Sequence, residues 1–300
     1  MPEVKVPYDP VNTSIVAVEE FNGAKMKTVS WKVPQGTPYK GKIIYVHGFN
    51  EDSKVYTQFF DNLCSNGIEV FFFEQRGAGE YSQGKLRGKT NEFHTFNDLD
   101  HFIKKNLDEA SDKLEKFFLA GHSMGGGIVL NYGINGTYKH SIKAIIACGP
   151  LITLAPKSQP NFILKSIMPA IVKLLPNFQI DTNLKYDYIT SNEDWKNYVI
   201  KSTPKFIGTT KQLHDMLARG EKLLNKSYAG KFNHPLLIVH GKDDQINDVN
   251  SSEIFYNNLS DKSNKIFYPV ENGKHSLFIE IEPIYKDVFN RVVEFIDQNK

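Results

Sequence analysis

The sequence has little of what marks an exported, disulfide-bonded or membrane-spanning protein. Cysteine occurs only twice in 300 residues, at Cys64 and Cys148, so we interpret both as buried free thiols in a reducing compartment. The first ten residues mix prolines with charges and lack the apolar core of a signal peptide. No apolar run approaches the ~20 residues that a membrane-spanning helix needs. We therefore expect a soluble, cytoplasmic protein.

Dense positive charge and metal-binding motifs are also missing. The formal net charge is +2 and no run of Lys and Arg occurs, so we expect no nucleic-acid partner. The chain has neither an H-E-x-x-H motif nor a closely spaced cysteine pair, and we expect no metal site. The sequence Gly77-Ala78-Gly79 lacks the third glycine of a dinucleotide-binding loop. We predict that the protein works without a cofactor.

The most informative stretch runs from Lys116 to Gly127. A short apolar run leads directly into Gly121-His122-Ser123-Met124-Gly125, and apolar residues suited to a buried helix follow. A strand, a tight turn with the pattern G-x-S-x-G, and a helix make up a nucleophile elbow, in which the flanking glycines avoid collisions around a strained serine. A glycine-rich turn without a catalytic role is the alternative. On the first interpretation, Ser123 is the nucleophile.

Apolar runs alternate with helical patterns over most of the chain. Two strands around a turn are predicted within residues 14–33. Buried strands are predicted at 42–46, 68–73, 142–148, 235–240 and 265–270, and helices at 53–66, 96–107, 249–259 and from Pro283 onward. Such alternation is typical of a mostly parallel, doubly wound sheet covered on both faces, so we predict an α/β fold.

The alternation stops between residues 151 and 233, where the pattern is helical without strands. We therefore divide the chain into a core, residues 1–150 and 234–300, and an insertion, residues 151–233. Pro169 should kink or divide the first helix of the insertion. That helix carries an apolar stripe made of Phe162, Ile163, Ile167, Ile171, Leu174 and Leu175, with Lys165 and Lys173 off it. It could lie on a membrane surface, but we favour a helix packed over a pocket.

A serine nucleophile needs a base, and the base needs an acid to orient it. The carboxyl ends of the last two predicted strands supply candidates downstream of Ser123: Asp243 and Asp244 after one strand, and His275 after the other. His122 should point away from the serine. We interpret His47 as a structural histidine that fixes its loop, and Arg76 as a residue that ties loops together. The other histidines, His94, His101, His140, His214, His234 and His240, are predicted to be ordinary.

Five motifs in order along the chain carry a family resemblance: His47-Gly48-Phe49-x-Glu51, Gln75-Arg76-Gly77-Ala78-Gly79, Gly121-His122-Ser123-Met124-Gly125-Gly126-Gly127, His240-Gly241-x-Asp243-Asp244 and His275-Ser276. The chain resembles the α/β-hydrolase superfamily, and within it the monoglyceride lipases, especially the fungal ones. The resemblance implies that Asp244 is the acid and that the amides of Phe49 and Met124 form the oxyanion hole. It also implies that Glu51 binds near the glycerol end of the site and that residues 151–233 form a mobile helical cap.

The same resemblance implies a serine hydrolase that cleaves monoacylglycerol into fatty acid and glycerol, with possible peripheral contact between the cap and a membrane or lipid droplet. Other serine carboxylester hydrolases remain open, namely a lysophospholipase, a carboxylesterase or a thioesterase. A non-catalytic lipid-binding module is a more remote alternative. Two positions depart from the family pattern: Asn50 stands where glycine is common, and Glu74 replaces an aspartate.

Overall fold

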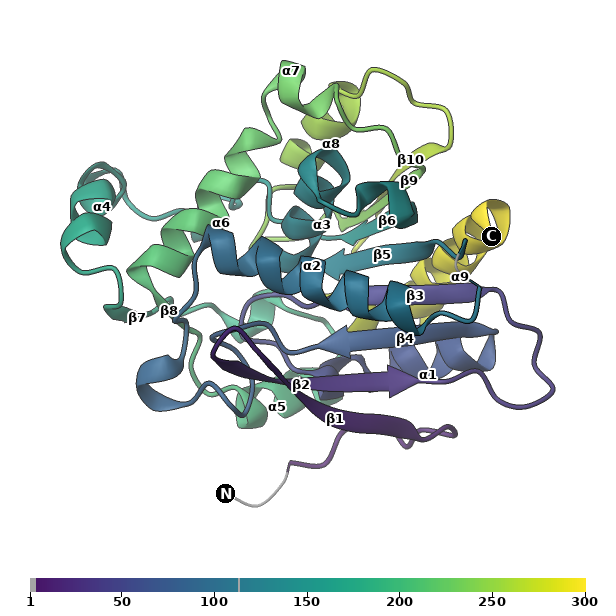
Figure 1. The fold of residues 1–300 in the computed structure, drawn as a ribbon. Helices are drawn as coiled ribbons and strands as arrows, with labels where there is room; N and C mark the ends of the chain where they lie inside the picture. The colour runs from purple at the N-terminus through teal and green to yellow at the C-terminus, as the bar shows by residue number, and fades with distance from the viewer. Residues whose placement is uncertain (1–3, 113) are drawn as a thin grey trace.

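The computed structural model describes residues 4–112 and 114–300, and it leaves out the side chains of residues 162–165. Its centre is an eight-stranded sheet in the order β1-β2-β4-β3-β5-β6-β9-β10 (Figure 1). The strands are β1 (Ser14–Phe21), β2 (Ala24–Trp31), β3 (Gly41–Val46), β4 (Ile68–Phe73), β5 (Phe117–His122), β6 (Ile142–Cys148), β9 (Leu236–Gly241) and β10 (Lys265–Val270).

The sheet is parallel from β4 to β10, whereas β1 and β2 form an antiparallel edge. The edge pair turns at Asn22 and Gly23, whose φ angles of 49° and 74° suit a tight hairpin. The parallel strands need crossover helices, and each crossover places the carboxyl ends of its strands at the same edge of the sheet. The predicted, mostly parallel α/β sheet is confirmed.

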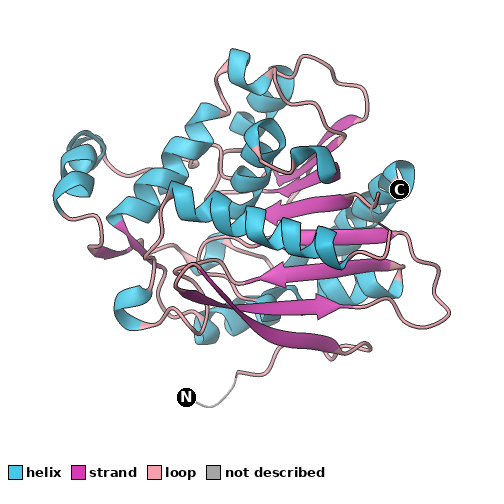
Figure 2. Ribbon diagram, in the orientation of Figure 1, coloured by secondary structure: helices cyan, strands magenta, loops and turns pink. Residues whose placement is uncertain are grey.

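Helices cover both faces of this sheet (Figure 2). Buried side chains of α1 (Thr57–Ser65) and α9 (Glu282–Asn299) join one apolar core, and those of α2 (Glu92–Glu109), α3 (Met124–Asn135) and α8 (Val249–Asn257) join the other. Along β3, Ile43 and Tyr45 face the first core, whereas Ile44 and Val46 face the second. Burial on both faces explains why the sequence of this strand is a continuous apolar run.

Between β6 and β9 the chain forms α4 (Phe162–Leu174), β7 (Gln179–Asp181), α5 (Glu193–Ser202), β8 (Ile207–Thr209), α6 (Thr210–Lys222) and α7 (Lys226–Ala229). The prediction that this segment has no strands was wrong, because β7 and β8 pair antiparallel. Strands of three residues are too short to leave a recognisable alternation. Pro169 lies inside α4, which is one continuous helix and is not divided.

The two cysteines are buried and free, as predicted. Within residues 4–112 and 114–300, no helix combines the length and the apolar composition needed to cross a membrane.

Candidate active site

Ser123 lies on a strained turn between β5 and α3. Its φ of 54° and ψ of −118° lie outside the conformations that a side-chain-bearing residue normally adopts. A Cβ atom on Gly121 would lie 2.5 Å from the carbonyl oxygen of Gly125, and one on Gly125 would lie 2.0 Å from that of Val46. Only glycine fits at either position. The predicted elbow geometry is therefore confirmed, and it exposes Ser123 to the pocket described below.

Asp244 and His275 lie together at the carboxyl ends of β9 and β10. Nδ1 of His275 is 2.8 Å from Oδ2 of Asp244. The other carboxylate oxygen accepts the backbone amides of Ile246 and Asn247 at 2.8 and 3.0 Å. Burial alone would raise the pKa of Asp244, but the nearby His275 and the hydrogen bonds hold it well below its usual range. The neighbouring Asp243 is exposed, so only Asp244 is placed to orient the imidazole.

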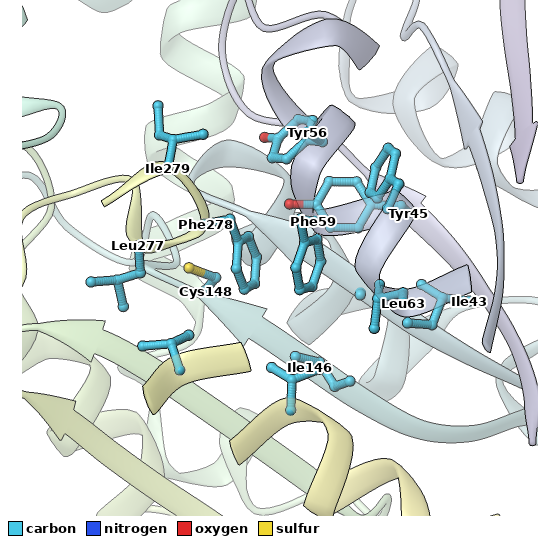
Figure 3. Close-up of a cluster of buried hydrophobic side chains, with 14 of the residues drawn as sticks. Ile43, Tyr45, Tyr56, Phe59, Leu63, Ile146, Cys148, Leu277, Phe278 and Ile279 are labelled. Atoms are coloured by element: carbon cyan, nitrogen blue, oxygen red, sulfur yellow. The ribbon is translucent and has the colours of Figure 1, made fainter. Parts of the chain in front are cut away.

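The loop that carries His275 is anchored by the apolar residues that follow it. Leu277, Phe278 and Ile279 are buried in a 3₁₀ turn, and the ring of Phe278 stacks on Phe59 of α1 at 3.8 Å between centroids (Figure 3). The amide of Ser276 also donates to the carbonyl of Ile189, in the segment between β6 and β9. The histidine is thus held from both the sheet and the inserted segment.

The loop after β3 carries Phe49, one of the two predicted oxyanion-hole residues. His47 fixes this loop as predicted: its Nδ1–H donates to the carbonyl of Gly48 (2.7 Å), and its Nε2 accepts the amide of Gln75 (2.9 Å). The other predicted residue, Met124, begins α3, and the amides in the first turn of a helix lack a partner within that helix. Both amides therefore belong to segments next to Ser123.

Arg76 ties loops together as predicted. Its Nε and Nη2 each lie 2.8 Å from an oxygen of Asp98 in α2, and Nη1 donates to the carbonyl of Asn22 in the hairpin turn. This bidentate pair fixes the loop after β4 against α2 and the edge of the sheet.

Glu51 and His122 form a second, unpredicted pair beside the serine. Nδ1 of His122 lies 2.8 Å from Oε1 of Glu51, and its Nε2 lies 3.1 Å from the backbone carbonyl of His275. Glu51 also accepts the amide of Gly48 and the hydroxyl of Tyr56. Although burial works in the opposite direction in each case, their mutual attraction lowers the pKa of Glu51 to about 2 and raises that of His122.

Ser123 and His275 open into one pocket with mainly apolar walls. Its core side is lined by Phe49, Asn50, Glu51, Val55, Ser123, His275, Ser276 and Ile279, and its other side by Leu184, Ile189, Val199, Thr203 and Phe206. The second set lies between β6 and β9, so the inserted segment supplies part of the apolar wall of the pocket. Glu51 places a carboxylate at the same pocket.

Asn50 connects the two sides of this pocket. Its φ of 58° is left-handed, a conformation that glycine adopts without strain. Its side-chain Nδ2 donates to the carbonyl of Ile207 in β8 at 3.0 Å. The other departure, Glu74, is buried and pairs with Lys27 at 3.0 Å. The hydrogen bond of Asn50 and the ion pair of Glu74 thus go to residues other than Asp244 and His275.

Two site residues were missed by reasoning from the sequence. Nδ2 of Asn247 lies 3.4 Å from Oγ of Ser123 and 2.8 Å from the carbonyl of Gly149. His240, predicted to be an ordinary histidine, contacts Asp244. The sequence offered one signal for His240, its position near the carboxyl end of β9, four residues before the acid in the loop that follows.

Comparisons with known proteins show the family of the chain. The model of a family described as serine aminopeptidase, S33, matches residues 37–282. The monoglyceride lipase of Saccharomyces cerevisiae is 39% identical over 94% of this chain and 92% of its own. The putative monoglyceride lipase of Schizosaccharomyces pombe is 35% identical over 91% of this chain and 71% of its own.

Solved structures show the same relationship. A soluble variant of the S. cerevisiae monoglyceride lipase, in complex with a substrate analog, superposes with a TM-score of 0.92 at 38% identity and covers 99% of both chains. A monoacylglycerol lipase from Paleococcus ferrophilus, 23% identical, shares the fold with a TM-score of 0.79 over 92% of this chain and 99% of its own. The chain therefore belongs to the serine hydrolases of the α/β-hydrolase fold, in the family that includes the fungal monoglyceride lipases.

Proposed function

We propose that this protein hydrolyses monoacylglycerol to a free fatty acid and glycerol, with Ser123, His275 and Asp244 as the catalytic triad. The observation that carries the proposal is that His275, which is hydrogen-bonded to Asp244, lines the same pocket as a serine on a strained elbow. The identity of 39% to a monoglyceride lipase supports the choice of substrate. Catalysis requires no cofactor in this proposal.

In the proposed mechanism, Ser123 Oγ attacks the ester carbonyl while His275 Nε2 accepts its proton. The ionised Asp244 holds Nδ1–H of His275 and stabilises the imidazolium that forms. The amides of Phe49 and Met124 donate to the oxyanion of the tetrahedral intermediate, and each such donor contributes about 3 kcal/mol of transition-state stabilisation. His275 then protonates the departing glycerol, and a water molecule activated by His275 releases the fatty acid from Ser123.

The pocket supports a substrate with one acyl chain and a polar alcohol. The apolar side chains of Leu184, Ile189, Val199 and Phe206 offer a surface for a hydrocarbon chain. In our proposal Glu51 accepts hydrogen bonds from the glycerol hydroxyls, since a carboxylate in a largely apolar pocket is a strong acceptor. We also propose that residues 151–233 act as a cap over the core formed by residues 1–150 and 234–300.

The deciding experiment measures fatty acid release from a long-chain 1-monoacylglycerol, beside diacylglycerol, triacylglycerol, lysophospholipid and a short-chain ester. We expect the monoacylglycerol to be hydrolysed with the highest kcat/KM, and Ser123→Ala to abolish the activity. A higher kcat/KM on lysophospholipid or on the short-chain ester than on monoacylglycerol would identify the protein as another kind of serine esterase. If the wild-type protein neither hydrolysed an ester nor reacted with a fluorophosphonate at Ser123, the protein would instead be a non-catalytic lipid-binding module.

We further propose that the cap touches a membrane or lipid-droplet surface through α4 and the loop after it. Ile167, Leu174, Leu175 and Phe178 are 47%, 77%, 55% and 57% exposed, and α4 lies at the periphery, on the side toward which the parallel strands point (Figure 1). The interpretation of this stripe as packed over a pocket was wrong for Ile167, Leu174 and Leu175. The side chains of Phe162, Ile163 and Lys165 lie outside the described part of the chain. An exposed apolar helix face suits an interfacial contact.

A further inference from the structure

A second histidine lies against the carboxylate of Asp244. His240, near the end of β9, is fully buried, and its Nε2 is 3.1 Å from Oδ2 of Asp244. The same oxygen receives Nδ1 of His275 at 2.8 Å. The carboxylate therefore lies between two imidazoles, of which His275 lines the pocket and His240 has no exposed surface.

The partners of His240 define where its protons lie. An ionised carboxylate only accepts hydrogen bonds, so Nε2 of His240 carries a proton and donates it to Asp244. On the far side of the ring, Nδ1 is 2.8 Å from Oγ of Ser252, a fully buried residue of α8. The Ser252 hydroxyl then donates to Nδ1. A continuous chain of hydrogen bonds thus runs from α8 through His240 to the acid.

We propose that His240 is a positioning residue for Asp244, which it holds through Oδ2 in the orientation that receives Nδ1 of His275. This inference rests on the proposed function, because it assigns a role within the same triad. The backbone amides of Ile246 and Asn247 hold only Oδ1. A donor on Oδ2 fixes the second oxygen as well, so the carboxylate is held at both oxygens while His275 takes up and releases its proton.

The bond from His240 also acts on the charge of the acid. When His275 takes the proton of Ser123, the resulting imidazolium lies against Oδ2 of Asp244. A second donor on that oxygen stabilises the ionised carboxylate and keeps the proton on the imidazolium. Without His240, Oδ2 attracts the proton of His275 more strongly, so His275 becomes a stronger base and remains protonated to higher pH.

Other titratable groups also face Asp244. Besides His240 from β9 and His275 from the loop after β10, these are His122 from β5 and Cys148 from β6, which interact with Asp244 through space. Burial raises the pKa of the Cys148 thiol well above its usual value, so it stays neutral. His122 is paired with Glu51. A change in pH dependence on substitution of His240 therefore reports on Asp244 and His275.

The test compares His240→Leu with His240→Gln, because glutamine retains a side-chain N–H donor near the position of Nε2. We expect kcat of His240→Leu to fall roughly 10- to 100-fold, the usual effect of losing a hydrogen bond to a charged group, and the acid limb of its kcat/KM profile to move to higher pH. His240→Gln should regain most of the activity and the wild-type limb. His234→Gln, just before β9 and away from the triad, is the matched control and should behave as wild type.

Titration of His275, followed by NMR of its ring protons, gives a second readout that needs no substrate. Its pKa should rise in His240→Leu and stay unchanged in His240→Gln. If the wild type lacked esterase activity, the proposed function would fail, whereas this titration would still test the role of His240. Equal losses in both variants with an unmoved titration would mean that His240 only fills space, and this would overturn the inference.

If His240→Leu does not fold, Ser252→Ala tests the same hydrogen bonds, because it removes the hydroxyl that contacts Nδ1 of His240. It should weaken the donor at Nε2 and shift the titration of His275 in the same direction by a smaller amount. A wild-type titration in this variant would overturn the inference.

Discussion

Glu51, which lines the pocket, forms an ion pair with His122, with 2.8 Å between Oε1 and Nδ1. His122 directly precedes Ser123 in the chain, and its other nitrogen contacts the backbone carbonyl of His275. The amide of Gly48 binds the same carboxylate. One pair thus joins the loop after β3, the elbow and the loop of the candidate base.

Replacing Glu51 by Gln should cost roughly 3 kcal/mol of unfolding free energy near pH 5.5, because it leaves His122 without its charged partner. The pKa of Glu51 is about 2 in the folded chain against 4.5 ordinarily, so its contribution is present above pH 4.5 and is lost as the pH falls toward 2. The pKa of His122 is raised, so its contribution is complete below its ordinary value of 6.5 and is lost as the pH rises through the folded value.

Thermal unfolding of wild type and Glu51→Gln across this range checks the prediction. The difference in Tm should be largest between the two ordinary pKa values, 4.5 and 6.5, and should shrink on either side. A difference that does not vary with pH would mean that the two residues are not linked as charges.

Substitution of the two neighbouring aspartates should separate the acid from its neighbour. Asp244→Asn should lower kcat by about four orders of magnitude, because an amide can hold His275 in the wrong tautomer. Asp243→Asn alters an exposed side chain and should leave kcat within about twofold, since surface substitutions seldom perturb a protein. Steady-state hydrolysis of monoacylglycerol measures both. The reverse ranking would move the acid to Asp243.

Asn50→Gly should loosen the connection between the core and the inserted segment without straining the backbone. Glycine accepts the φ of 58°, but the hydrogen bond from Asn50 to the carbonyl of Ile207 is lost. We expect faster amide hydrogen exchange in β7 and β8 and a loss of about 1 kcal/mol in their local opening free energy.

Asn22→Gly is the control for this effect, because Asn22 has a similar φ of 49° but lies in the β1–β2 turn. Its substitution should leave exchange in β7 and β8 unchanged. The same increase in both variants would show that the Asn50 side chain does not hold the segment.

Charge placed on the exposed apolar surface of α4 and the loop after it should abolish binding to lipid. Leu174→Asp with Phe178→Asp should release the protein from phosphatidylcholine vesicles in a flotation assay, because each change places a charge where apolar contact is proposed. Neither residue lines the pocket, so hydrolysis of a soluble short-chain ester should be unchanged. Ile15→Asp, on the exposed edge strand β1, is the matched control. Equal flotation of all variants would remove α4 as the contact.

Much of the fold and part of the site could be predicted because their signals are local. Buried parallel strands require continuous apolar runs, and the elbow requires glycine on both sides of Ser123, since backbone atoms of the neighbouring strand and helix occupy the space of a Cβ. Patterns of a few residues also predict the hairpin turn at Asn22-Gly23 and the end of each strand. Such features can be predicted without knowing which segments pack against them.

Contacts between distant segments were decided only by the tertiary structure. Glu51 and His122 are 71 residues apart, and Asn50 and Ile207 are 157 apart. No short-range sequence pattern predicts contacts over such separations. The backbone of one loop buries Asp244 and leaves Asp243 exposed. The two side chains are identical, so their chemistry alone does not predict which of them is buried. Two strands of three residues were hidden for the same reason, because each is stabilised by pairing with the other. The sequence by itself determined the sheet, the elbow and a short set of candidates for acid and base. Packing decided which of those candidates meet, because a hydrogen bond forms only between groups that the whole chain brings within reach.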